Sequence, residues 1–264
     1  KLLITRVNLT VQFFFSINNI MSVEIPEIPD YIKKIKIDIG LSNEAVYSSV
    51  WLNKEPDLFV LGFEPLETAI ANCYKQPNAP YGDGIKPPGT SRHLQTKDHN
   101  RVHFYQVALS DVEKEETKEF YISKFDTGCS SFWKPEKGNM IDFGTVPIDV
   151  KVWNLAMVLE PFFEKYKNRF EYIDFIKVDA QGSDLSIVKG AGKWLAEKVV
   201  YITVECDGSY YTDCSWRKPD LNIYMESIGF IELNHYNTHD PTYINSKFKH
   251  LQHDIYISQN SGCD

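Results

Sequence analysis

The stretch Glu171-Tyr-Ile-Asp-Phe-Ile-Lys-Val-Asp-Ala-Gln-Gly-Ser-Asp-Leu-Ser-Ile-Val-Lys-Gly190 carries the clearest structural signal in this chain. Residues 173–178 are apolar and rich in β-branched side chains, which predicts a short buried strand. The strand ends on Asp179, and after Gly182 the serine and aspartate at 183 and 184 predict an N-cap and the first turn of a helix. Ligands bind outside the carboxyl ends of strands in open α/β sheets, so this stretch predicts a carboxylate at a binding edge.

Short apolar strands alternate with helical segments along the rest of the chain. Strands are expected at 35–40, 58–63, 102–109, 119–123, 147–153 and 199–204, and helices at 45–52, 157–170, 184–195 and 221–228. The glycines at 190 and 192 predict that the helix after residue 184 is short or interrupted. Residues 230–233 and 254–258 are expected to form an antiparallel, hairpin-like pair. This order predicts an α/β fold, a Rossmann-like and mainly parallel sheet with helices on both faces and an antiparallel strand at its C-terminal edge.

The length of 264 residues suits one domain. We expect residues 1–30 to form an N-terminal docking segment and residues 31–264 to form a single domain with a loop insertion at 77–101. Residues 2–20 are partly apolar, but Arg6 and Asn18 interrupt them and the run is too short to span a bilayer. The sequence therefore predicts no stable membrane insertion.

Charge and cysteine content exclude several classes of function. A formal net charge of -8 without any basic run argues against a nucleic-acid-binding surface. The five cysteines are scattered and form no CxxC pair, which disfavours zinc and redox motifs. An odd, scattered set fits a reducing compartment, so a cytoplasmic location is expected. The sequence carries no signal for an oligomeric state.

Acidic or polar side chains occur at the ends of five predicted strands. They are Asp38, Glu64, Ser110 with Asp111, Asp179 and Glu205. One aspartate after a strand is usually a cap or turn residue, but the ends of parallel strands meet at the same edge of a sheet. Clustered carboxylates are costly unless a ligand, a metal or a counter-charge uses them. The row of strand ends therefore predicts a binding crevice.

The turn after the first strand decides between two kinds of cofactor. A dinucleotide needs a glycine-rich turn to hold its pyrophosphate, and residues 40–44 read Gly-Leu-Ser-Asn-Glu, with one glycine. Asp38 and Glu44 would repel a phosphate. S-adenosylmethionine carries a cationic sulfonium and no phosphate, and Glu64 is placed to accept hydrogen bonds from its ribose. These acids favour the sulfonium cofactor over NAD.

The chain resembles the FkbM family of S-adenosylmethionine-dependent methyltransferases. The pieces that carry the resemblance are residues 37–40 (Ile-Asp-Ile-Gly), 62–65 (Gly-Phe-Glu-Pro), 107–111 (Val-Ala-Leu-Ser-Asp), 176–184 (Ile-Lys-Val-Asp-Ala-Gln-Gly-Ser-Asp) and 189–191 (Lys-Gly-Ala). They span most of the chain between residues 35 and 205. Two departures stand out: the glycine-rich turn is reduced to Gly40-Leu-Ser-Asn, and Gln181 stands where the family often has glutamate.

The resemblance implies a class I methyltransferase fold and a set of cofactor contacts. The implied cofactor-binding residues are Asp38, Gly40, Ser42, Glu64, Pro65, Ser110, Asp111 and Asp179. Asp38 and Gly40 would border the methionine end, Glu64 the ribose, and Ser110 with Asp111 the adenine. The implied acceptor is a hydroxyl on a sugar of a polysaccharide or glycoconjugate.

Transfer to an alcohol needs a base that takes the hydroxyl proton. Asp179 is the first candidate for this base, and Glu205 and His235 are the next candidates. A divalent metal held by Asp179, Glu205 and Asp207 is an alternative, because a metal also lowers the pKa of an alcohol. Lys177 lies inside a predicted buried strand, which favours an ion pair with neighbouring carboxylates over catalysis.

Trp133 and Tyr211 fall in predicted loops, where aromatic side chains often stack on sugar rings, so both are candidate substrate-binding residues.

Two other functions are compatible with the sequence. One is a nucleotide-sugar oxidoreductase, against which the missing glycine fingerprint counts. The other is a non-catalytic Rossmann-like module that binds a glycan or a protein.

Overall fold

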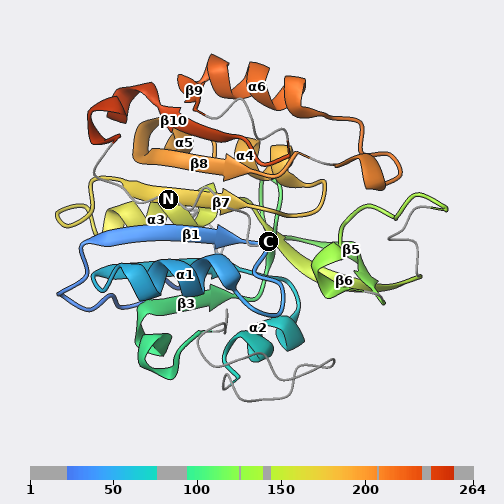
Figure 1. The fold of residues 1–264 in the computed structure, drawn as a ribbon, viewed down its shortest axis with the longest axis horizontal. Coiled ribbons are helices and arrows are strands. Elements are labelled where there is room, and N and C mark those ends of the chain that lie inside the picture. Colours follow the sequence, from blue (N-terminus) through green and yellow to red (C-terminus); the bar gives the residue numbers. More distant parts are fainter. Residues whose placement is uncertain are drawn as a thin grey trace, which may run out of the picture.

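A computed structural model describes residues 23–75, 94–124, 126–138, 144–206, 208–233 and 239–252. Its centre is a seven-stranded sheet in the order β3-β2-β1-β7-β8-β10-β9 (Figure 1). The strands are β1 (Lys34–Ile39), β2 (Leu58–Phe63), β3 (Val102–Tyr105), β7 (Ile173–Val178), β8 (Val199–Val204), β9 (Phe230–Glu232) and β10 (Thr242–Asn245). Neighbouring strands from β3 to β8 pair in parallel, whereas β10 runs antiparallel to both β8 and β9. The Rossmann-like, mainly parallel sheet predicted from the sequence is confirmed.

The antiparallel strand does not come from the predicted segment. The partner of β9 is β10, Thr242–Asn245, which lies inside the stretch expected to be a connection. Residues 254–258, the predicted partner, lie outside the described residues. The prediction missed β10 because it has only four residues, of which two, Tyr243 and Ile244, are apolar, too short a run to indicate a strand.

Two of the predicted strands belong to a second sheet and not to the central one. β5 (Glu116–Ser123) and β6 (Thr145–Trp153) join the short β4 (Ala108–Leu109) in a separate sheet of order β4-β6-β5. The predicted strand at 102–109 is therefore divided between the two sheets, with a turn in which the Val107 amide donates to the Tyr105 carbonyl, 3.0 Å away. The first four residues of β5 alternate half-buried with exposed side chains, and only Phe120 and Ser123 of this strand are buried, which fits an antiparallel strand with one solvated face.

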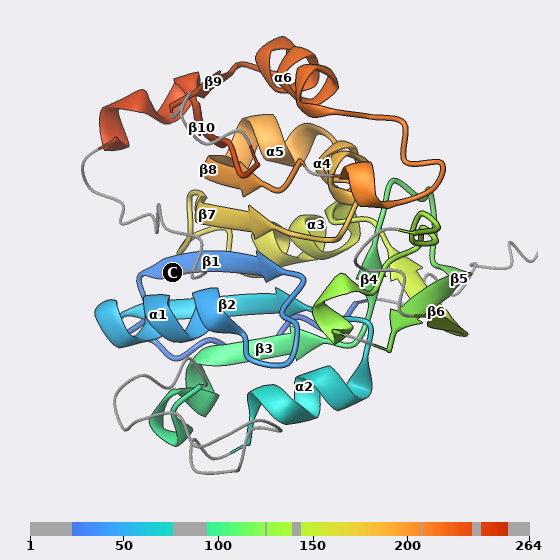
Figure 2. The same cartoon turned by 45° about the vertical axis from the view of Figure 1, so that its right-hand side comes forward.

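Helices cover both faces of the central sheet. They are α1 (Val46–Lys54), α2 (Glu67–Cys73), α3 (Ala156–Lys165), α4 (Asp184–Gly190), α5 (Lys193–Lys198) and α6 (Lys218–Ser227). α1 lies on one face and α3 on the other (Figures 1 and 2). Short 3₁₀ helices lie at Thr96–Arg101, Thr127–Cys129, Gly208–Tyr210 and Ser246–Leu251. As predicted, the segment after residue 184 is two short helices.

The side-chain alternation of β1 assigns one set of residues to each face. Ile35, Ile37 and Ile39 pack with α3 residues in one core cluster. Trp51 of α1 packs with Phe175 in a second cluster on the opposite face. Lys36 and Asp38, which alternate with the isoleucines, therefore lie on the α1 face of the sheet.

The chain before β1 is held against the end of α3. The Tyr166 hydroxyl donates to the Pro26 carbonyl at 2.7 Å, and Arg169 donates to the Ile28 carbonyl at 2.7 Å. Of the predicted docking segment, residues 1–22 lie outside the described residues, as do residues 76–93 of the predicted insertion.

Among the described residues, no helix combines the length and apolar composition that crossing a membrane requires.

Candidate active site

A cavity of about 390 Å³ lies at the carboxyl ends of the central strands, between the central sheet and the β4-β6-β5 sheet. It is lined by Ile39, Gly40, Ser42, Phe63, Glu64, Pro65, Val107, Ala108, Leu109, Phe120, Asp126, Thr127, Gly128, Cys129, Ser130, Phe132, Asp179, Ala180, Gln181, Ser183, Ile187 and Glu205. Of the residues singled out from the sequence, Gly40, Ser42, Glu64, Pro65, Asp179 and Glu205 are in this lining. The ends of four neighbouring strands thus meet around one hollow, as their order predicted.

Gly40 allows the ends of β1 and β7 to meet. Its φ is +79°, a backbone conformation that glycine adopts without strain. A Cβ built at this position would lie 1.8 Å from the carbonyl oxygen of Asp179. Any side chain at Gly40 would therefore push apart the two strand ends that form the floor of the cavity.

Glu64 follows β2 and is held by two backbone amides. One carboxylate oxygen accepts from the Ser42 amide at 3.1 Å and the other accepts from the Leu66 amide at 3.1 Å. The side chain is only 6% exposed, and burial raises the pKa of Glu64 to about 7 against these two hydrogen bonds. The carboxyl group is fixed at the cavity wall with acceptor capacity left on both oxygens.

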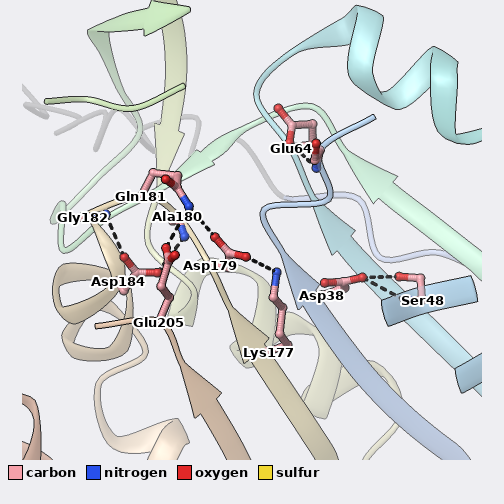
Figure 3. Close-up of polar contacts among 11 residues, drawn as sticks. Asp38, Ser48, Glu64, Lys177, Asp179, Ala180, Gln181, Gly182, Asp184 and Glu205 are labelled. Atoms are coloured by element: carbon pink, nitrogen blue, oxygen red, sulfur yellow. Dashed lines mark hydrogen bonds and ion pairs between the residues drawn. The ribbon is translucent and has the colours of Figure 1, made fainter. Parts of the chain in front are cut away.

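Asp179, directly after β7, is the centre of a polar network (Figure 3). Its Oδ2 contacts the Lys177 ammonium at 2.9 Å, and its Oδ1 accepts from Gln181 Nε2 at 2.8 Å. The same Gln181 nitrogen donates to Glu205 Oε2 at 2.9 Å. Lys177 thus forms the predicted ion pair, and one amide bridges two carboxylates from neighbouring strands.

The two bridged carboxylates have opposite electrostatic surroundings. Burial disfavours the charged form of Asp179, but the Lys177 charge and hydrogen bonds outweigh it and lower the pKa of Asp179. Burial, followed by the charges of Asp179 and Asp184, raises the pKa of Glu205 well above its usual range. The surroundings therefore favour the negative charge on Asp179 over a negative charge on Glu205.

Asp184 shapes the turn that carries Gln181. It accepts from the Ala180 amide at 2.6 Å and from the Gly182 amide at 3.0 Å. Burial raises the pKa of Asp184 to about 7. The predicted N-cap role of Ser183 is not seen, since its side chain makes no capping hydrogen bond; Asp184 serves the preceding amides instead.

Three predicted cofactor contacts lie away from the cavity lining. Asp38 faces α1, where its Oδ2 accepts from the Ser48 amide at 3.0 Å and the Ser48 hydroxyl at 2.6 Å (Figure 3). Its Oδ1 is buried without a hydrogen-bond partner, and burial raises the pKa of Asp38. Ser110 and Asp111 bond each other at 3.2 Å, while the preceding residues 107–109 line the cavity instead.

Trp133 and Tyr211 contact the turn after β7 rather than the cavity. Trp133 Nε1 donates to the Gly182 carbonyl at 3.2 Å, and Trp216 Nε1 donates to the same oxygen at 2.7 Å. The Tyr211 hydroxyl lies 2.7 Å from Gln181 Oε1. Both predicted sugar platforms therefore hold the Gln181-Gly182 turn in place. Sequence reasoning missed this support, and it missed Phe120 and Phe132 in the lining.

Two predicted site residues, His235 and Asp207, lie outside the described residues. Within the part of the chain that the structure describes, no group of three or more histidine, cysteine, aspartate or glutamate side chains could hold a metal ion. Asp179 instead bonds to Lys177 and to the Gln181 amide, and Asp184 accepts a hydrogen bond from a backbone amide.

A mainly parallel sheet with an acid-lined cavity at its carboxyl edge defines a Rossmann-like enzyme that binds a small ligand at the strand ends. The family model described as "Methyltransferase FkbM domain" matches residues 38–246 of the chain. The protein belongs to this FkbM methyltransferase family and is a methyltransferase. A comparison with curated proteins finds no match.

Proposed function

We propose that the protein is an S-adenosylmethionine-dependent O-methyltransferase whose acceptor is a sugar hydroxyl in a polysaccharide or glycoconjugate. The observation that carries the proposal is the pair of carboxyl groups, Asp179 and Glu205, that Gln181 bridges at the wall of the cavity. A carboxylate beside the crevice can receive the proton that an alcohol sheds during methyl transfer.

The charges around the cavity fit this cofactor. Glu64, Asp179 and Glu205 all line it, and the negative charge favoured on Asp179 attracts a cationic sulfonium and repels a pyrophosphate. Each oxygen of Glu64 accepts one backbone hydrogen bond, so both retain lone pairs for ribose hydroxyls. Aromatic and aliphatic side chains supply an apolar wall for an adenine ring; they are Phe63, Val107, Leu109, Phe120 and Phe132.

When bound, S-adenosylmethionine supplies a methyl group on a positively charged sulfur. The protein's part is to align the acceptor oxygen and to receive its proton. Asp179 accepts that proton, and the Lys177 ammonium 2.9 Å away keeps the carboxylate ionised beforehand. The raised pKa of Glu205 disfavours a second negative charge beside Asp179.

A polar side of the cavity supports a hydroxyl-rich acceptor. Asp126, Thr127 and Ser130 follow β5 and line the cavity. Such groups donate to and accept from the hydroxyls of a sugar. A panel of oligosaccharides incubated with cofactor and analysed by mass spectrometry tests this assignment; methylation of amines or carboxylates in preference to hydroxyls would contradict it.

Calorimetric titration with S-adenosylhomocysteine tests the cofactor assignment. Wild-type protein is expected to bind, and Glu64→Ala is expected to weaken binding at least about tenfold, because hydrogen bonds to a charged group contribute about 1.5–3 kcal/mol. Glu160→Ala, which removes an exposed carboxylate on α3, serves as the matched control and should bind like the wild type. Absence of binding, or binding of NAD instead, would reject the proposal.

A further inference from the structure

A single side-chain nitrogen joins the two carboxylates of the site. Gln181 Nε2 lies 2.8 Å from Asp179 Oδ1 and 2.9 Å from Glu205 Oε2. Figure 3 shows the amide between the two acids, which come from the ends of neighbouring strands. Two carboxylates that share one partner in this way are also the arrangement by which proteins hold a hard divalent cation.

The orientation of the Gln181 amide is fixed by its surroundings. Its Oε1 lies 2.7 Å from the Tyr211 hydroxyl, which donates to it. The reversed orientation would set Oε1 against the oxygens of both carboxylates; the Tyr211 hydroxyl, which also lies 3.1 Å from the Cys129 carbonyl, has a partner in either orientation. The Ser131 hydroxyl also donates to the Gln181 carbonyl at 2.6 Å, which holds the backbone at its φ of +52°.

The neighbouring acids have their own partners. The second oxygen of Asp179 pairs with Lys177, and both oxygens of Asp184 accept backbone amides. The Gln181 amide nitrogen donates to both Asp179 and Glu205, and the two carboxyl groups also interact directly with each other.

We propose that Gln181 is a positioning residue whose amide replaces a divalent cation between Asp179 and Glu205, so that methyl transfer at this site runs without a metal. The catalytic consequence rests on the proposed function, but the cation-binding consequence does not. A glutamate at this position would bring three carboxylates together, and their shared partner would then be a Mg²⁺ or Mn²⁺ ion.

The first test is calorimetric titration with Mn²⁺ at fixed ionic strength. Wild-type protein should show no saturable binding, whereas Gln181→Glu should bind Mn²⁺ saturably, with a dissociation constant at least about tenfold below the weakest that the titration detects. The double variant with Asp179→Asn should lose that binding. Gln106→Glu, which adds the same charge at an exposed position, controls for nonspecific attraction. Saturable Mn²⁺ binding by the wild type that Asp179→Asn removes would overturn the proposal.

The second test is the rate of methyl transfer with and without EDTA. The wild-type rate should not change, and the rate of Gln181→Glu should depend on added Mn²⁺. Gln181→Met keeps the length of the side chain and removes the amide; its kcat should fall while its KM for the cofactor is kept, and Mn²⁺ should not restore it. A wild-type enzyme that EDTA inactivates and Mg²⁺ restores would overturn the inference.

The two proposals fail separately. If S-adenosylhomocysteine does not bind, the proposed function is rejected, and the Mn²⁺ titration of the wild type and Asp179→Asn still decides whether a cation site exists. Thermal unfolding of each variant establishes that it is folded before it is titrated. The wild-type titration needs no variant that introduces a buried charge, so it decides the question even where Gln181→Glu fails to fold.

Discussion

Two buried lysines on the same face of neighbouring strands have opposite surroundings. Lys36 on β1 forms an ion pair with Glu55, a residue that Lys34 also contacts at 3.1 Å. Lys177 on β7 is the register partner of Asp38 and pairs with Asp179. At the first cluster Lys34 and Lys36 offset Glu55 and Asp57, and the pKa of the third acid, Asp174, is raised to about 7. At the second cluster, acids are in excess around one lysine.

The difference appears in the pKa values of the two amines. Burial is the largest influence on Lys36 and lowers its pKa although Glu55 opposes the shift. Burial also acts on Lys177, but the charges of Asp179 and Asp38 outweigh it and raise its pKa. Buried lysines and acids whose charges offset each other need no ligand to explain their presence. An excess of acids at an open strand edge needs a proton, a hydrogen-bond donor or a cationic ligand as well.

The largest predicted effect comes from Asp179→Asn. Removal of a general base lowers kcat by about 10²–10⁴-fold, while binding of S-adenosylhomocysteine should be retained. Asp174→Asn makes the same chemical change in the Lys36 cluster and serves as the matched control, with kcat expected to stay at the wild-type level. Steady-state kinetics with calorimetry measures both. Full activity in Asp179→Asn would show that the base lies elsewhere.

The next effect concerns stability and has opposite signs in the two clusters. Glu55→Ala leaves the ammonium of Lys36 buried without its ion pair and should cost about 3–5 kcal/mol of unfolding free energy. Glu205→Gln removes an acid from the cluster where acids are in excess, and should leave stability unchanged or raise it. Urea unfolding of both variants measures the contrast. Equal losses in both would contradict the division into balanced and excess clusters.

The smallest effect is a pH dependence of stability that comes from Asp174. Burial raises its pKa from 3.8 to about 7 against the hydrogen bond from the Ile35 amide. The folded protein therefore binds this proton more tightly than the unfolded chain does. The stabilisation is complete below about pH 4 and is lost as pH rises to about 7.

Asp174→Asn should remove this contribution, because the amide oxygen still accepts from Ile35 and carries no titrating proton. Unfolding free energies of the two proteins, measured from pH 4 to pH 8, should diverge as pH rises, with the variant the more stable at pH 8. Parallel curves would mean that Asp174 does not titrate in this range.

The parallel strands of the central sheet and the positions of three strand-end acids at the cavity could be predicted from the sequence. Asp38 was predicted there too, but it lies elsewhere for a reason that its position in β1 explains. Glu64, Asp179 and Glu205 each follow the last residue of a strand, so their side chains reach the cavity. Asp38 lies one residue before the end of β1. Its place in the alternation with Ile37 and Ile39 directs it to the α1 face, where Ser48 holds it.

Other features depend on contacts between distant parts of the chain and could not be predicted. The separate β4-β6-β5 sheet forms because β6 pairs with both β4 and β5, a choice that no local pattern states. The role of Gln181 depends on Tyr211 and Glu205, which follow it by 30 and 24 residues. From sequence, Gln181 was only a departure from the family pattern; the geometry makes it the bridge of the site.

A crystal structure of the complex with S-adenosylhomocysteine tests the central claim most directly. The account predicts the ligand in the cavity at the strand ends, with its ribose hydroxyls on Glu64 and its sulfur on the side of Asp179 and Glu205. A ligand bound elsewhere, or bound here with its sulfur turned away from both carboxylates, would contradict it.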